Sequence, residues 1–114
     1  EGTKICTMRK NHITVMRMND NYSLSVGVKH EKNSITLLKV DNNSIWQARE
    51  GLYRDAQTII DQFKRGFEVK TEFNAFNTAK PVVNEVSLIG FSDAFNDMQQ
   101  QYSKLDHLDA QRRF

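Results

Sequence analysis

Hydrophobic and polar residues alternate through the first half of the chain, which is the pattern of strands that bury one face. The clearest alternation sets Tyr22, Leu24, Val26 and Val28 on one side and small polar residues on the other. Asn- and Asp-rich turns separate such segments, and their regular spacing favours an antiparallel meander. The pattern predicts strands over Ile5–Met8, His12–Met18, Tyr22–Val28, Ser34–Val40 and Ser44–Ala48.

A helical period replaces the strand period in the middle of the chain. Apolar residues three and four positions apart would line one face of a helix: Ala56, Ile59, Ile60 and Phe63. Asp55 near the start, with Lys64 and Arg65 near the end, suits the helix dipole. The pattern predicts a helix over Arg54–Arg65, ended by Gly66 in a left-handed conformation.

Strand periodicity returns after the helix, with Phe67, Val69, Thr71 and Phe73 expected on one buried face. A last strand is expected over Val82–Leu88, because Pro81 suits the position before a strand.

A long amphipathic helix closes the chain. Gly90 breaks the last strand, Ser92 is a plausible N-cap, and the helical pattern runs over Asp93–Arg113. The more polar end, residues 104–114, is expected to project. A projecting end of this kind either docks on a partner or is a frayed terminus, and the sequence leaves both open.

These elements predict one α+β domain over residues 1–114. We expect an antiparallel meander or sandwich of about seven short strands, a short mid-chain helix and a long C-terminal helix. With 39% hydrophobic and 26% charged residues, the composition is that of a globular domain.

Charge and composition narrow the function classes. Sixteen basic residues against fourteen acidic ones give a net charge of +2, which argues against a nucleic-acid binder. No apolar run is long enough to predict a transmembrane segment. The single cysteine, Cys6, excludes an intramolecular disulfide and a zinc site built from several cysteines. The chain begins at Glu1, and we expect a leader to have been removed before it.

Candidate catalytic and metal-binding residues form no recognised motif. His12, His30 and His107 have no partner at a ligand spacing, so we expect neither a metal nor a cofactor. Cys6 could act as a nucleophile with His12 or His30 as base, but a small apolar residue in a strand is the simpler reading. Glu68 and Glu72 are too far apart along a strand to form a glycosidase pair.

Several hydrophobic residues are candidates for partner or ligand contacts. Trp46 either anchors the core or lies on a binding face. The four methionines either form an adaptable surface or fill gaps in a small core. The residues that we expect to contact a partner or ligand are Trp46, Tyr102, Leu105, Leu108 and Phe114.

Two segments support a family resemblance. Ile-Ile-Asp-Gln-Phe-Lys-Arg-Gly spans residues 59–66, and Val-Ser-Leu-Ile-Gly-Phe-Ser-Asp-Ala-Phe spans residues 86–95. Their order, with a strand between them, resembles the C-terminal half of the invasion-associated locus B family of bacterial envelope proteins. The resemblance implies a periplasmic or secreted domain of β-sandwich type and brings no catalytic residues. It also implies that Leu88, Phe91 and Phe95 plug the end of the core.

The sequence therefore predicts a non-enzymatic, exported envelope domain that binds another protein or a second copy of itself, with a possible link to host interaction. The alternative is a small-molecule or lipid carrier with a pocket between sheet and helix, lined by residues such as Trp46, Phe73 and Phe95. An enzyme that uses Cys6 or the histidines is the third hypothesis.

Overall fold

The structure is a computed structural model that describes residues 3–112, with side chains as far as residue 105. The elements in chain order are β1 (Ile5–Lys10), β2 (Ile13–Met18), β3 (Asn21–Val26), β4 (Ile35–Val40), β5 (Trp46–Arg49), β6 (Leu52–Tyr53), α1 (Gln57–Arg65), β7 (Glu68–Phe73), β8 (Val82–Ser87) and α2 (Phe91–Arg112). The α+β class predicted from the sequence is confirmed.

The strands form two antiparallel sheets of four strands each. The first sheet has the order β1-β2-β3-β6, and the second sheet has the order β5-β4-β7-β8. Only Glu50 and Gly51 separate β5 from β6, so the chain passes from the second sheet to the first in one tight turn. Their φ angles of 52° and 74° are both positive, which a two-residue turn of this kind requires.

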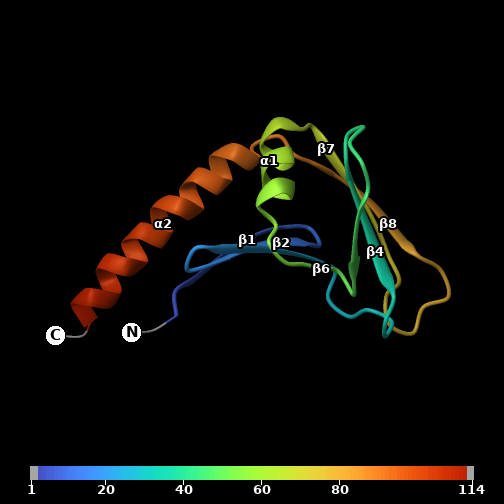
Figure 1. Cartoon of the computed structure of the whole chain (residues 1–114), viewed down its shortest axis with the longest axis horizontal. Coiled ribbons are helices and arrows are strands. Elements are labelled where there is room, and N and C mark those ends of the chain that lie inside the picture. Colours follow the sequence, from blue (N-terminus) through green and yellow to red (C-terminus); the bar gives the residue numbers. More distant parts are fainter. Residues whose placement is uncertain (1–2, 113–114) are drawn as a thin grey trace.

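The two sheets lie crosswise, and both helices pack on the same side of the first sheet (Figure 1). Helix α1 fills the angle between the sheets with Ile59, Ile60 and Phe63, all of which are buried. Helix α2 buries Phe95, Met98 and Tyr102, and its C-terminal half runs out beyond the strands. The core therefore lies where the two sheets and α1 meet, with α2 closing one side.

Asparagine and aspartate make the turns, as their frequency between strands predicts. They account for most of the residues other than glycine with positive φ angles: Asn11, Asn19, Asn33, Asp41, Asp55 and Asn77. These side chains tolerate the left-handed conformation and can hydrogen-bond to nearby backbone, so they bend the chain where other residues would be strained.

The predicted strand faces are confirmed within the strands and wrong at two ends. Leu24 and Val26 are fully buried, whereas Val28 is 79% exposed because β3 ends at Val26 and Gly27 turns the chain with a φ of 76°. Phe67 was expected inside but is 76% exposed, because β7 begins only at the next residue.

Three element boundaries differ from the prediction. The structure has eight strands instead of about seven, because the two-residue strand β6 lies just before the predicted helix, in a stretch to which the sequence pattern assigns no element. Helix α1 begins at Gln57, so Asp55 precedes it. Helix α2 begins at Phe91, and Ser92 lies inside the helix instead of capping it.

Gly66 ends α1 for a different reason from the predicted one. Its φ of −95° and ψ of 174° are extended, not left-handed. A Cβ at this position would lie 2.6 Å from Val40 Cγ1 and 2.9 Å from Asp41 Oδ2. The absence of a side chain therefore allows the helix end to approach β4 closely.

Candidate functional site

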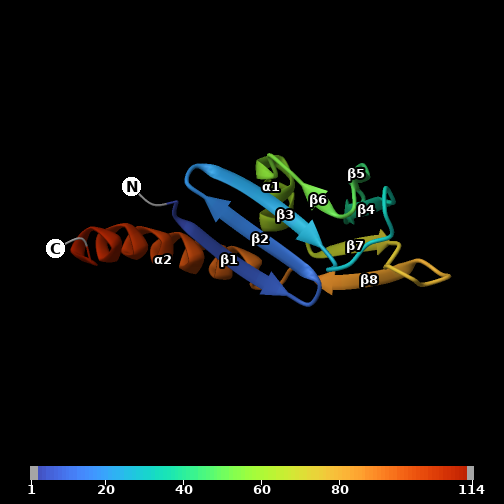
Figure 2. The same cartoon turned by 90° about the horizontal axis from the view of Figure 1, so that it is seen from below.

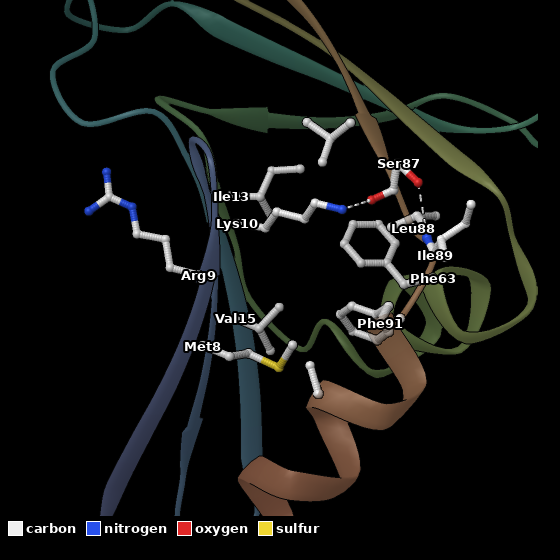
Figure 3. A pocket seen from close by; sticks show the side chains of 13 residues that line it. Met8, Arg9, Lys10, Ile13, Val15, Phe63, Ser87, Leu88, Ile89 and Phe91 are labelled. Carbon is white, nitrogen blue, oxygen red and sulfur yellow. Dashed lines mark hydrogen bonds between the residues drawn. The ribbon is translucent and has the colours of Figure 1, made fainter.

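An apolar cavity of about 200 Å³ lies where the first sheet meets the β8–α2 junction (Figure 3). Strands β1 and β2 form one wall with Met8, Ile13 and Val15, and Phe63 of α1 lies opposite. The remaining wall is the segment from the end of β8 into the first turn of α2, residues 86–91, together with Ala94.

The backbone at the β8–α2 junction is fixed by short hydrogen bonds. Phe91 N donates to Leu88 O at 3.0 Å, and Ile89 N donates to Ser87 Oγ at 3.2 Å. Gly90 provides the left-handed step between strand and helix, with a φ of 86°. This tight exit directs Phe91 inward to the cavity and leaves Ile89 81% exposed, pointing away from it (Figure 3).

Aromatic side chains build the floor of the cavity. Phe91 meets Phe63 edge to face, with ring centroids 5.2 Å apart, and stacks on Phe95 at 5.9 Å. Lys64 Nζ lies 4.3 Å from the centre of the Phe95 ring and covers it from the solvent side. Leu88 and Phe95 are buried, as the resemblance implies, whereas Phe91 is only half-buried and leaves the cavity open.

Two basic residues of β1 lie at the cavity. Lys10 Nζ donates to Ser87 O at 2.7 Å and so bridges the two sheets at the edge of the cavity (Figure 3). Arg9 points away from the cavity, and its Nε donates to Asn11 O at 3.1 Å. The walls are therefore hydrocarbon, and the ammonium group at the edge is held by a carbonyl oxygen.

The residues predicted to contact a partner lie in separate places. Trp46 packs partly against the core, donates from Nε1 to Gln62 Oε1 at 3.0 Å, and also lines a shallow surface hollow beside β5 and β6. Tyr102 is 6% exposed and packs on Arg17 of the first sheet. Leu105 is half-buried at the far part of α2. Leu108 and Phe114 lie outside the residues whose side chains are described.

The three side chains suggested for a carrier pocket occupy different environments. Trp46 lies at β5, Phe73 packs beside the rings of His12 and His30, and Phe95 contacts Tyr22 and Phe91. The cavity does lie between a sheet and a helix, but other residues line it. Sequence reasoning missed Met8, Ile13 and Val15 because only tertiary packing brings β1 and β2 to the β8–α2 junction.

The candidate nucleophile Cys6 is not paired with either of the two histidines whose side chains are described, His12 and His30. Cys6 is opposite Arg17 in the β1–β2 register, whereas His12 directly precedes Ile13, which is opposite Lys10 at the other end of β1. These positions are about 13 Å or more apart along the strand. The His12 ring is hydrogen-bonded to Thr71 Oγ1, and His30 Nε2 bonds to Val26 O, so both rings join core elements.

Glu68 and Glu72 lie on the solvent face of β7, as predicted, and Lys70 between them pairs with Glu85 at 3.4 Å. Among the described residues, no three His, Cys, Asp or Glu side chains gather closely enough to hold a metal ion. In the same part of the chain, neither helix combines the length and apolar character needed to cross a membrane.

The fold and the cavity define the class of protein: an α+β domain of two antiparallel sheets with a small apolar recess at the sheet–helix junction. Comparisons with protein-family models, with curated proteins and with solved structures found no match.

Proposed function

We propose that this protein is a non-catalytic binding domain whose cavity receives one apolar side chain of a partner protein. The observation that carries the proposal is the recess of about 200 Å³ with hydrocarbon walls at the junction of β1, β2 and α2. The ammonium group at its edge, on Lys10, is directed to Ser87 O and not into the recess.

The size of the recess suits a single side chain. An apolar cavity of about 150 Å³ in a protein core is enough to hold benzene. Ligand pockets for drug-sized molecules run from about 300 to 1,000 Å³, which is larger than this recess. A Phe, Leu or Met side chain of a partner fits the space, and burying it yields about 1.5–3 kcal/mol.

The surroundings of the recess support a protein partner. Ile89 is 81% exposed beside it, and Phe67, whose carbonyl accepts from Leu88 N, is 76% exposed on the neighbouring strand end. A partner whose side chain enters the recess would meet this further apolar surface next to it, and contacts of that kind exclude water from an inserted anchor.

We further propose that the domain works in the periplasm or outside the cell, as a relative of the invasion-associated locus B family. The support for this location is the resemblance of residues 59–66 and 86–95. Cell fractionation of the native organism, followed by immunoblotting, tests it: a signal confined to the cytoplasmic fraction would count against export.

The binding proposal can be tested by filling the recess. Ala94 lines it from an exposed helix position, so Ala94→Leu adds bulk there without opening the core. Asn96→Leu is the matched control, because it adds an apolar side chain to an exposed position of α2 that does not line the recess. Circular dichroism and urea unfolding establish that both variants fold.

Peptides selected on the wild-type protein from a random displayed library provide the probe. We expect them to share one Phe, Leu, Met or Trp whose replacement by Ala abolishes binding. We expect Ala94→Leu to weaken their binding about 10-fold or more and Asn96→Leu to leave it unchanged. Equal affinity of the peptides for the wild type and for Ala94→Leu would show that they bind elsewhere and would count against the proposal.

A carrier of small apolar molecules is the second candidate, and the position of the recess between sheet and helix favours it. Native mass spectrometry of gently purified protein tests it, since a carrier retains a defined added mass that Ala94→Leu lacks. A protein that shows only its own mass supports the partner-binding proposal over this one.

A further inference from the structure

The face of the first sheet that turns away from the helices is open and almost uncharged. Both helices pack on the opposite face, and Figure 2 shows strands β1, β2 and β3 without any described element in front of them. Side chains alternate between the two faces of a strand, so the buried residues of each strand show which of its side chains point outward. The outward side chains of the first sheet are Ile5, Thr7, Arg9, Thr14, Met16, Met18, Asn21, Ser23, Ser25 and Leu52. We call this set the neutral face.

The neutral face differs sharply from the equivalent face of the second sheet. Charged residues make up about half of the outward side chains there: Lys39, Arg49, Glu68, Lys70, Glu72 and Glu85. Arg9 is the one charged member of the neutral face, and its Nε is bonded to Asn11 O at the adjoining turn. A solvated surface normally carries roughly 25–35% charged residues, so the single charged side chain of the neutral face needs an explanation.

The register places apolar residues across the middle and both ends of the neutral face. Met16 of the central strand β2 is opposite Thr7 on one side and Ser23 on the other. Ile5 and Met18 are opposite each other at one end and are 47% and 41% exposed. Leu52, 43% exposed, lies at the other end. Short hydroxyl side chains between these positions keep the surface flat.

We infer that the neutral face packs against the same face of a second copy of this chain, forming a two-fold symmetric dimer. Close to a two-fold axis each residue meets its own counterpart, so a charge at the centre of such an interface would oppose a like charge. The neutral face avoids that repulsion, and its flexible methionines can adapt to each other across it. Aligned sheets pack face to face at about 10 Å, which leaves room for these side chains.

The size of the neutral face predicts a weak dimer. Strands of six residues are roughly 20 Å long, and the paired strands are about 4.8 Å apart, so the flat footprint is on the order of 300–400 Å² per copy. Stable interfaces bury about 800 Å² per partner. We therefore expect reversible association at concentrations on the order of 100 µM, not a permanent dimer.

Sedimentation velocity of the full chain from about 5 µM to 1 mM tests this inference. We expect the weight-average mass of the wild type to rise above the monomer mass of 13.2 kDa as concentration increases. Met16→Lys places a charge at the centre of the neutral face and should keep the protein monomeric throughout. Leu37→Lys is the matched control, because Leu37 is a half-buried outward residue on the central strand β4 of the second sheet.

Chemical crosslinking keeps the test decisive if Met16→Lys fails to fold. A two-fold axis through the centre of the neutral face brings Met16 next to Met16 of the second copy. In a Cys6→Ser background, Met16→Cys should form an intermolecular disulfide at least 10-fold faster than Leu37→Cys under the same oxidant.

Either of two results would overturn the inference: a wild type that stays at 13.2 kDa up to 1 mM, or equal crosslinking rates at the two positions. Loss of association in Leu37→Lys but not in Met16→Lys would assign the dimer to the second sheet and would equally overturn it. The inference does not rest on the proposed function, because the recess that Ala94→Leu fills is on the other side of the first sheet.

Discussion

The guanidinium carbon of Arg17 lies 3.8 Å from the centre of the Tyr102 ring, which joins the first sheet to α2. Arg17 Nη1 also donates to Gln99 Oε1 at 3.0 Å, and Gln99 Nε2 in turn donates to Tyr22 Oη at 2.7 Å. A cation on an aromatic face and two linked hydrogen bonds therefore hold the middle of α2 on the first sheet.

Arg17→Ala should destabilise the protein by about 1–3 kcal/mol, because it removes a cation–π contact and the hydrogen bonds to Asn19 O and Gln99 Oε1 at once. Arg49→Ala is the control, since Arg49 is exposed and makes only a long 3.4 Å bond to Asn33. Urea unfolding followed by circular dichroism measures both changes. Equal, small losses in the two variants would mean that α2 does not depend on Arg17.

Replacing two neighbouring phenylalanines should have unequal costs. Phe63 is 1% exposed, so Phe63→Ala should cost about 3–5 kcal/mol. Phe91 is half-buried against the open recess, so Phe91→Ala should cost about half as much. Chemical denaturation of the two variants under one set of conditions provides the comparison. A cost for Phe91 as large as that for Phe63 would indicate that the recess is closed in solution.

Acid should weaken the fold through His12. Burial lowers the pKa of His12 below its ordinary value of 6.5, so the folded protein favours the neutral ring. The stabilisation is then complete above pH 6.5 and is lost as the pH falls below it, toward the lower pKa of the folded state. We therefore expect the unfolding free energy, measured between pH 8 and pH 5, to fall less steeply with decreasing pH in His12→Gln than in the wild type. An unchanged pH profile in the variant would assign the effect to other groups.

Gly66→Ala and Gly90→Ala should both destabilise the protein, the first through close packing and the second through backbone strain. At Gly66 a Cβ would lie 2.6 Å from Val40 Cγ1, so Gly66→Ala should cost about 1–3 kcal/mol through overpacking. At Gly90 a Cβ would meet no atom within 4 Å, so only the positive φ opposes it, at about 1–2 kcal/mol.

A second substitution in each background distinguishes the two mechanisms. Val40→Ala should reduce the cost of Gly66→Ala because it removes the atom that the new Cβ meets. The same change should leave the cost of Gly90→Ala unaltered. Thermal unfolding of the single and double variants measures both couplings, and additive costs at Gly66 would contradict the packing explanation.

Most of the elements could be predicted because local patterns specify them. The alternation along Val69, Thr71 and Phe73 fixes which face of β7 is buried, and the helical spacing of Ile59, Ile60 and Phe63 fixes the buried face of α1. The errors lie at element ends, such as Val28 and Phe67, where one turn residue changes the direction of the side chain.

The candidate site could be predicted only in part. The strand-to-helix step after Leu88 is recognisable in the sequence, because Gly90 interrupts the strand before a helical pattern begins. The opposite wall comes from Met8 and Val15, which are more than seventy residues away in the chain. No local period shows which strands will face that step.

The sequence by itself determined the class of fold, the strand and helix faces and the Asn-rich turns, because these depend on neighbours a few residues apart. Only the tertiary structure decided that the strands divide into two sheets, that Gly66 lets the end of α1 pack closely on β4, and that a recess remains beside Phe91. These features depend on how separate elements fill a shared volume, and that packing is set by the whole chain at once.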